Sequence, residues 1–119
     1  MTHVQPLGIH HVNVTVGEMD SAREFYLGHL GLTERTDRPE FPFDGAWIDV
    51  GGQQIHLVVG TPRTPDRDHF AMIVADLDVA CASLRECGVE VSEPRGVATS
   101  RQSFLRDPWG NLIELQQVG

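Results

Sequence analysis

The sequence has few cysteines, few cationic residues and no long apolar run, and each shortage excludes a class of protein. Nine basic against seventeen acidic residues give a formal net charge of −8, and the basic residues are scattered instead of forming a stripe. Such a chain repels phosphate backbones, so we expect no nucleic-acid partner. No apolar stretch approaches the roughly 20 residues that cross a membrane, so we expect no membrane partner either. The first residues lack the basic and apolar regions of a secretion signal, which favours a cytoplasmic protein.

The two cysteines, Cys81 and Cys87, are too few and too unfavourably spaced to form a disulfide framework. They lie six residues apart in a segment that we predict to be helical, which turns them roughly 240° away from each other. Neither belongs to a Cys-x-x-Cys motif. We expect both to be small buried apolar residues in a reducing compartment.

The sequence does have the composition of one folded domain, with 119 residues, 40% hydrophobic and 22% charged. Its most informative stretch is residues 8–16, which read Gly-Ile-His-His-Val-Asn-Val-Thr-Val. Alternation along a strand places the three valines on one face. A strand of this kind is half buried, and its polar face lies toward water or a chemical site. That second face carries Ile9, His11, Asn13 and Thr15.

The chain repeats this pattern once. A shift of 58 residues carries His11 onto His69. The same shift carries His56 onto Glu114, and each of these two residues lies between an isoleucine and a leucine. Self-similarity at a fixed period indicates repeated structural units, and two copies predict two modules.

Each module is predicted to have the element order β-α-β-β-β. Module 1 covers about residues 7–59 and module 2 about residues 69–117, with a proline-containing linker over residues 60–68. The helix of module 1 should begin at an Asp20 N-cap and end at Gly31. The other expected elements are strands over 8–16, 32–36, 46–50 and 53–59, then a strand over 69–74, a helix over 77–88, and strands over 89–92, 102–106 and 112–117.

Four potential metal ligands occupy equivalent strand positions in the two modules. Their apolar neighbours point toward the helices, so the four side chains share the opposite face. If the modules pair about a pseudo-twofold axis, these side chains converge in one concave pocket. Imidazole nitrogen and carboxylate oxygen suit borderline divalent ions, and four such ligands leave two positions of a six-coordinate ion for a chelating substrate. The predicted ligands are His11, His56, His69 and Glu114.

Other residues complete the candidate site. Trp47 is expected in the core and not as a stacking platform. The loops over residues 37–42 and 93–101 would contact a substrate, but they carry no recognisable motif, so the substrate stays open. Ordinary structural roles are expected for the histidines outside the repeat, which are His3, His10 and His29. The positions expected to line the substrate site are Asn13, Thr15, Gln102 and Phe104.

Several stretches resemble the vicinal oxygen chelate superfamily, which includes glyoxalase I, methylmalonyl-CoA epimerase, extradiol dioxygenases, fosfomycin-resistance transferases and bleomycin-resistance proteins. The run Phe-Pro-Phe-Asp-Gly-Ala-Trp at 41–47 is most similar to the glyoxalase-I-like branch. The resemblance implies an α+β fold in which two paired βαβββ modules form a curved sheet around a metal cleft. It is carried by the 8–16 stretch, Ile-His-Leu at 55–57, His-Phe-Ala-Met-Ile-Val-Ala-Asp-Leu at 69–77 and Asp-Pro-Trp-Gly-Asn-Leu-Ile-Glu-Leu at 107–115.

By this resemblance, His11, His69 and Glu114 match the family's metal ligands, whereas His56 stands where glyoxalase I carries a glutamate. The resemblance implies a glyoxalase-I-like lyase or isomerase with one divalent ion, either Ni, Co, Mn, Zn or Fe. Its small substrate would chelate the ion through vicinal oxygens, and Glu114 would be the catalytic base. A homodimer with sites at the module interface is also implied.

Two other functions stay open. Extradiol dioxygenases hold Fe(II) with two histidines and one carboxylate, a set present here as His11, His69 and Glu114, with His56 outside it. Bleomycin-resistance-like members bind drugs in the same cleft without a metal. Such binders usually replace the ligand positions, and all four ligand-capable side chains are present in this sequence.

Overall fold

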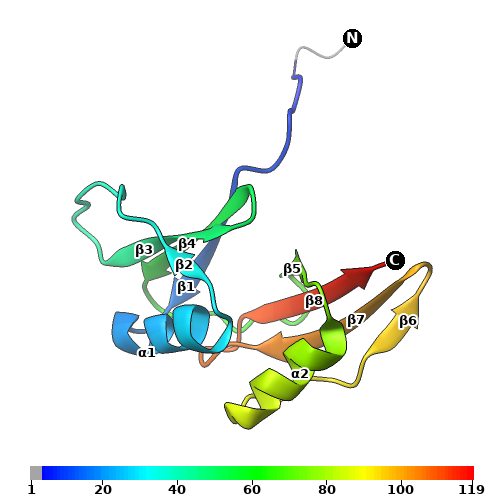
Figure 1. Ribbon diagram of the computed structural model, residues 1–119. Coiled ribbons are helices and arrows are strands. Elements are labelled where there is room, and N and C mark those ends of the chain that lie inside the picture. The colour runs from blue at the N-terminus through cyan, green and yellow to red at the C-terminus, as the bar shows by residue number, and fades with distance from the viewer. Residues whose placement is uncertain (1–3) are drawn as a thin grey trace.

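Two four-stranded sheets of identical topology make up the computed structural model, which describes residues 4–119 (Figure 1). The strand orders are β1-β4-β3-β2 and β5-β8-β7-β6. This confirms the predicted α+β fold with two paired β-α-β-β-β modules. The elements are β1 (His11–Val16), α1 (Met19–Arg23), η1 (Glu24–His29), β2 (Thr33–Glu34), β3 (Gly45–Val50), β4 (Gln53–Val59), β5 (His69–Ile73), α2 (Leu77–Glu86), β6 (Arg95–Val97), β7 (Ser100–Arg106) and β8 (Leu112–Val118).

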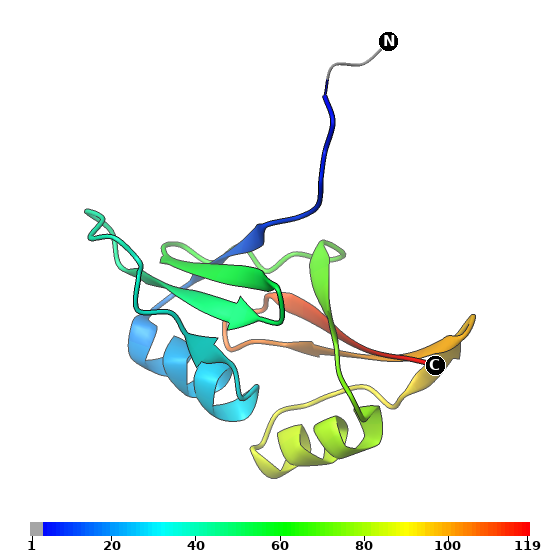
Figure 2. The ribbon, with the colours of Figure 1, turned by 45° about the horizontal axis from the view of Figure 1, so that its top comes forward.

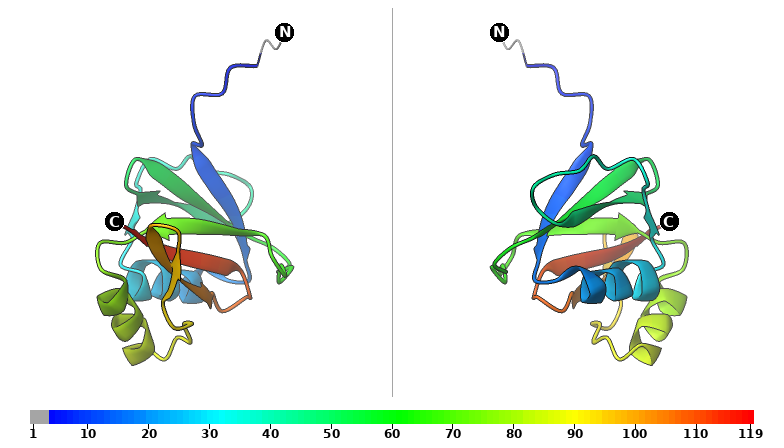
Figure 3. Two further views of the ribbon diagram at one scale, coloured as in Figure 1. Left: turned by 90° about the vertical axis from the view of Figure 1, so that its right-hand side faces the viewer. Right: turned by 90° about the vertical axis from the view of Figure 1, so that its left-hand side faces the viewer.

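The predicted strand faces are confirmed by burial. Val14 and Val16 of β1 are buried, whereas His11 and Asn13 are exposed. Each ligand-bearing strand of module 1 has its counterpart in module 2, because β1 pairs in parallel with β4 and β5 pairs in parallel with β8. The helices α1, η1 and α2 lie on one side of the sheets (Figure 3). The other side of each sheet carries no helix of residues 4–119, and we call it the open face (Figure 3).

The first helix differs from the prediction at its N-cap and in its π-helical second half. Its N-cap is Glu18 and not Asp20. The Glu18 carboxylate accepts hydrogen bonds from the backbone N–H groups of Asp20 and Ser21, which follow it in the chain. The helix then widens into the π-helix η1, in which Leu30 N–H donates to the Phe25 carbonyl at 2.9 Å. Gly31, at φ 70°, ends the helix as predicted.

The predicted strand over residues 89–92 is wrong. Only one isolated bridge, Val91 to Leu105, forms there, and the outer strand is instead β6, Arg95–Val97. Pro94 lies between the two segments and has no N–H to donate, so a continuous ladder cannot run through it. The β6–β7 hairpin therefore occupies most of the segment that was expected to be a loop.

The turn over residues 107–111 joins the two modules. The buried hydroxyl of Tyr26, in η1, donates to Asp107 Oδ2 at 2.7 Å. Asn111 Nδ2 donates to the Thr15 carbonyl of β1 at 2.8 Å. Apolar side chains from both modules form one buried cluster around this joint. The predicted tight turn is thus confirmed, and it also fixes how the modules pack.

The two cysteines differ in their exposure to solvent. Cys81 is buried, as predicted, but Cys87 is exposed at the end of α2, because the helix stops one residue before it. Both thiols are free. Between residues 4 and 119, no helix is long and apolar enough to cross a membrane.

Replacing Gly45 by alanine should destabilise the fold. Gly45 is buried at the start of β3, and an added Cβ would collide with the carbonyl oxygen of Leu57 on the paired strand β4. Backbone cannot move aside cheaply, so we expect a loss of about 1–3 kcal/mol in urea unfolding. Gly28→Ala is the matched control, because a Cβ at Gly28 meets no atom within 4 Å. Equal stability of the two variants would contradict this packing.

Candidate functional site

The open face of the first sheet carries one histidine pair. His11 lies on β1 and His56 on the neighbouring strand β4, and their imidazole rings stack with centroids 3.8 Å apart. The chain folds this way locally because both residues alternate with valine, isoleucine or leucine side chains that face the core. Two predicted ligands are therefore brought together.

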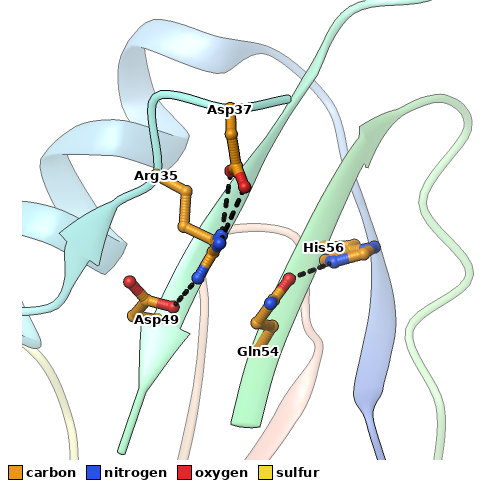
Figure 4. A network of polar contacts seen from close by, with 5 residues as sticks. All are labelled: Arg35, Asp37, Asp49, Gln54 and His56. Atoms are coloured by element: carbon orange, nitrogen blue, oxygen red, sulfur yellow. Dashed lines mark hydrogen bonds and ion pairs between the residues drawn. The ribbon is translucent and has the colours of Figure 1, made fainter. Parts of the chain in front are cut away.

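His56 is fixed by contacts with several neighbouring side chains. Its Nε2–H donates to Gln54 Oε1 at 2.8 Å (Figure 4), and the ring of Trp47 stacks on it at 4.6 Å. Burial, followed by the nearby charges of His11 and His10, lowers the pKa of His56. The imidazole is therefore kept neutral, and with Nε2 occupied its Nδ1 carries the free lone pair that a metal ion requires.

The open face of the second sheet carries the other predicted pair. His69 on β5 and Glu114 on β8 interact at 3.1 Å between Nε2 and Oε1. His69 Nδ1 donates to the Arg67 carbonyl at 2.8 Å. That backbone hydrogen bond, together with the Glu114 carboxylate, raises the pKa of His69. A backbone carbonyl that accepts a hydrogen bond from one ring nitrogen orients the other nitrogen, which is a common arrangement for a ligating histidine.

The two pairs stay separate within one chain. Among residues 4–119, no three histidine, cysteine, aspartate or glutamate side chains gather closely enough to hold a metal ion. The donor types fit a divalent ion, and each pair supplies two of them. The described chain thus presents two separate pairs of candidate ligands, and the predicted four-ligand centre would require the two pairs, as half-sites, to be brought together.

His10 lies against the first pair, with its Nδ1 2.9 Å from Nδ1 of His11. An ordinary structural role was predicted because His10 is out of phase with the repeat. Since β1 begins only at His11, the backbone of His10 is free of the strand alternation, and its ring can turn toward the same face. The His-His dipeptide was the available sequence signal. His29 packs on Phe25, and His3 lies outside the described residues.

The position of Trp47 also differs from the prediction. Its neighbours Ala46 and Ile48 are buried in the core, so alternation along β3 turns Trp47 to the open face, where it is half buried against His56. The predicted core role is therefore wrong. Strict alternation along residues 46–50 was the signal that could have identified this.

The predicted substrate-site residues fall into two groups. Asn13 and Thr15 line a cavity of about 810 Å³ together with His69 and the segment over residues 63–68. Phe104 contacts the edge of the His69 ring at 5.4 Å between centroids. Gln102 lies on the same strand, β7, without a described contact to either ligand pair. A larger hollow of about 1130 Å³ borders η1 and the end of α2, and it contains none of the predicted ligands.

Comparisons with known proteins identify the family and the fold. The model of the Glyoxalase/Bleomycin resistance protein/Dioxygenase superfamily matches residues 8–115. A Synechocystis protein named "Probable lactoylglutathione lyase" is 28% identical over 91% of this chain and 93% of its own length. The crystal structure of a "putative glyoxalase family protein" from Bacillus anthracis superposes with a TM-score of 0.84 at 28% identity, covering 99% and 100% of the two chains. TnmS3, an antibiotic binding protein from Streptomyces sp. CB03234, has a TM-score of 0.78 at 27% identity, covering 98% and 100%.

Proposed function

Because the chain belongs to the Glyoxalase/Bleomycin resistance protein/Dioxygenase superfamily, we propose that it is a divalent-metal-dependent lyase or isomerase of the glyoxalase I type. Its substrate would be a small molecule with two neighbouring oxygens. The observation that carries the proposal is the pairing of His11 with His56 and of His69 with Glu114 on equivalent strands of two equivalent sheets. Unrelated polar residues would not be expected to form side-chain pairs at equivalent positions of both modules.

A bound divalent ion, either Ni, Co, Mn, Zn or Fe, would supply Lewis-acid polarisation of the substrate oxygens. The residues that would hold it are His11, His56, His69 and Glu114. Three neutral imidazoles and one carboxylate leave a net charge of +1, whereas the two carboxylates of a glyoxalase I site would cancel the charge. His56 therefore favours stabilisation of negative charge on substrate oxygens over proton shuttling.

Glu114 is the residue that we propose as the base. It is the one carboxylate in the set, it is buried, and it already shares a hydrogen bond with His69. A carboxylate in this position can take the proton from the carbon next to a substrate carbonyl and return it to the neighbouring carbon. His69, fixed by the Arg67 carbonyl, keeps the Glu114 side chain oriented between these transfers.

The complete site is proposed to lie in a homodimer, where the His11 and His56 pair of one copy faces the His69 and Glu114 pair of the second. Two apolar side chains support this arrangement. Ile73 and Val118 lie in phase with His69 and Glu114 on the open face of the second sheet, and they are 73% and 60% exposed. Covering them with a second copy would remove apolar surface from water.

We also propose a cytoplasmic location, since both cysteines are unpaired.

Metal analysis of the purified protein tests the proposal. We expect about one divalent ion per chain, with the affinity reduced at least tenfold in both His56→Ala and Glu114→Ala. His29→Ala is the matched control and should keep the metal, because His29 packs on Phe25 away from both pairs. Conversion of a 2-oxoaldehyde thiohemiacetal, lost in Glu114→Ala, is the expected activity.

Other outcomes would favour the alternatives. Iron retained in His56→Ala but lost in Glu114→Ala, with oxygen uptake on catechols, would replace the proposal by an Fe(II) dioxygenase. The engagement of His56 by Gln54 and Trp47 is the observation that favours this second candidate. No metal after reconstitution would favour a metal-free binding protein, the kind of function that the name of TnmS3 states for that relative.

A further inference from the structure

A line of aromatic rings runs from an exposed loop to the first ligand pair. The connection between β2 and β3, residues 35–44, projects beyond its sheet (Figure 2). Phe41 and Phe43 in this loop stack at 4.9 Å between centroids, and Phe41 lies 6.3 Å from Trp47. Trp47 stacks on His56, which stacks on His11. We name these five rings the aromatic strip.

The outer rings of the strip are exposed, although they are apolar. Phe41 and Phe43 are 40% and 45% exposed, and neither belongs to the buried core cluster. Part of the apolar surface of both rings is therefore accessible to a ligand, whose binding would remove that surface from water. The two rings are stacked nearly parallel, with 12° between their planes, so a planar group could extend the same stack.

The loop is held in place before any ligand arrives. Arg35 forms two hydrogen bonds to Asp37 and one to Asp49 of β3, which fixes the start of the loop (Figure 4). Arg38 lies over the Phe41 and Phe43 rings, at 4.9 and 5.5 Å, and donates to the Phe43 carbonyl at 3.0 Å. A fixed loop loses little conformational entropy on binding, so it can select its ligand by shape.

We propose that the aromatic strip binds a flat aromatic ring carried by the substrate beside its chelating oxygens. The inference rests on the proposed metal site, because His11 and His56 are the inner end of the strip and would hold the ion that the oxygens reach. Stacking on Trp47, Phe41 and Phe43 rewards a planar ring more than an aliphatic group. The substrate class is therefore aryl-bearing oxygen chelators.

Two hydroxamates that share the chelating oxygens test the proposal. 2-Naphthohydroxamate carries the flat ring and acetohydroxamate does not. By calorimetry on metal-loaded protein, we expect the naphthyl compound to bind at least tenfold tighter after correction for the ratio measured on the free metal ion. In Phe41→Ala/Phe43→Ala the corrected ratio should fall to about one. Phe41→Tyr/Phe43→Tyr should restore it, and Val79→Ala, an exposed apolar change on α2, should leave it unchanged.

A metal-free titration separates failure of the strip from failure of the metal site. Trp47 fluorescence should be quenched by 2-naphthohydroxamate in apoprotein, and this response should be absent in Trp47→Phe. If the protein takes up no metal but Trp47 quenching by the naphthyl compound persists, the proposed metal enzyme is contradicted and ring binding by the aromatic strip is supported. Metal uptake with a corrected ratio of one in the wild type would overturn the strip and keep the enzyme. Neither metal uptake nor quenching would overturn both.

Discussion

Replacing Asp107 by alanine is expected to lower the midpoint of thermal unfolding by roughly 10–15 °C, which corresponds to about 3 kcal/mol for a domain of this size. Asp107 is only 5% exposed and accepts hydrogen bonds from the Tyr26 hydroxyl, the Trp109 N–H, and both the backbone and side-chain nitrogens of Asn111. Buried donors that lose a charged acceptor retain their full desolvation cost. The turn would also lose its link to Tyr26 of module 1.

Tyr26 explains why the loss should be large. Burial, and then the adjacent Asp107 carboxylate, raise the pKa of Tyr26, so its hydroxyl stays protonated and always donates. Tyr26→Phe removes this donor but leaves Asp107 its other partners, so a smaller loss of about 1 kcal/mol is expected. Glu86→Gln, a surface change at the end of α2, is the control. If Asp107→Ala unfolds within 3 °C of the control, the turn is not the joint between the modules.

Mixing two inactive variants is expected to restore about a quarter of the wild-type metal content. One variant, His11→Ala/His56→Ala, lacks the half-site of the first sheet, and the other, His69→Ala/Glu114→Ala, lacks that of the second. In a twofold dimer whose sites combine halves from two chains, a mixed dimer has one intact site and one site without ligands. Random pairing makes half of the dimers mixed, so about one site in four should bind metal.

Co-refolding followed by metal analysis makes this measurement, with native mass spectrometry to count mixed dimers. Each variant alone should bind no metal at the concentration that fills the wild type. A mixture of His11→Ala/His56→Ala with His11→Ala alone is the matched control, because no pairing of these chains contains an intact first half-site. Mixed dimers without metal would contradict sites formed between chains and would favour closure of both half-sites within one chain.

The sequence predicted those features that depend on local alternation. Burial of Val14 and Val16 with exposure of His11 follows from the two-residue period of a strand, whatever packs on it. The same period, applied to both copies of the repeat, places His56 next to His11 and Glu114 next to His69. These pairs form between strands that are neighbours in the same sheet.

Predictions were wrong where one particular side chain, and not the two-residue period of a strand, decides the local structure. The first helix begins after Glu18, two residues before Asp20, because the Glu18 carboxylate accepts the hydrogen bonds of the first backbone N–H groups. Pro94 interrupts the pairing of the outer strand of the second sheet. Trp47 was predicted to lie in the core, although the alternation of Ala46 and Ile48 indicates the opposite face of the sheet.

Strand alternation and the repeat thus predicted the two modules, the strand faces and the four candidate ligand side chains, because each depends on contacts within one strand or between repeat-equivalent positions. Three features could be found only from the folded chain. The candidate ligands form two separate pairs, Trp47 and the loop over residues 35–44 extend one pair into the aromatic strip, and Tyr26 and Asp107 join the modules. The reason is physical: strand alternation has a period of two residues, whereas the packing of one sheet against another is set by side chains distant in the sequence, such as Tyr26 and Asp107.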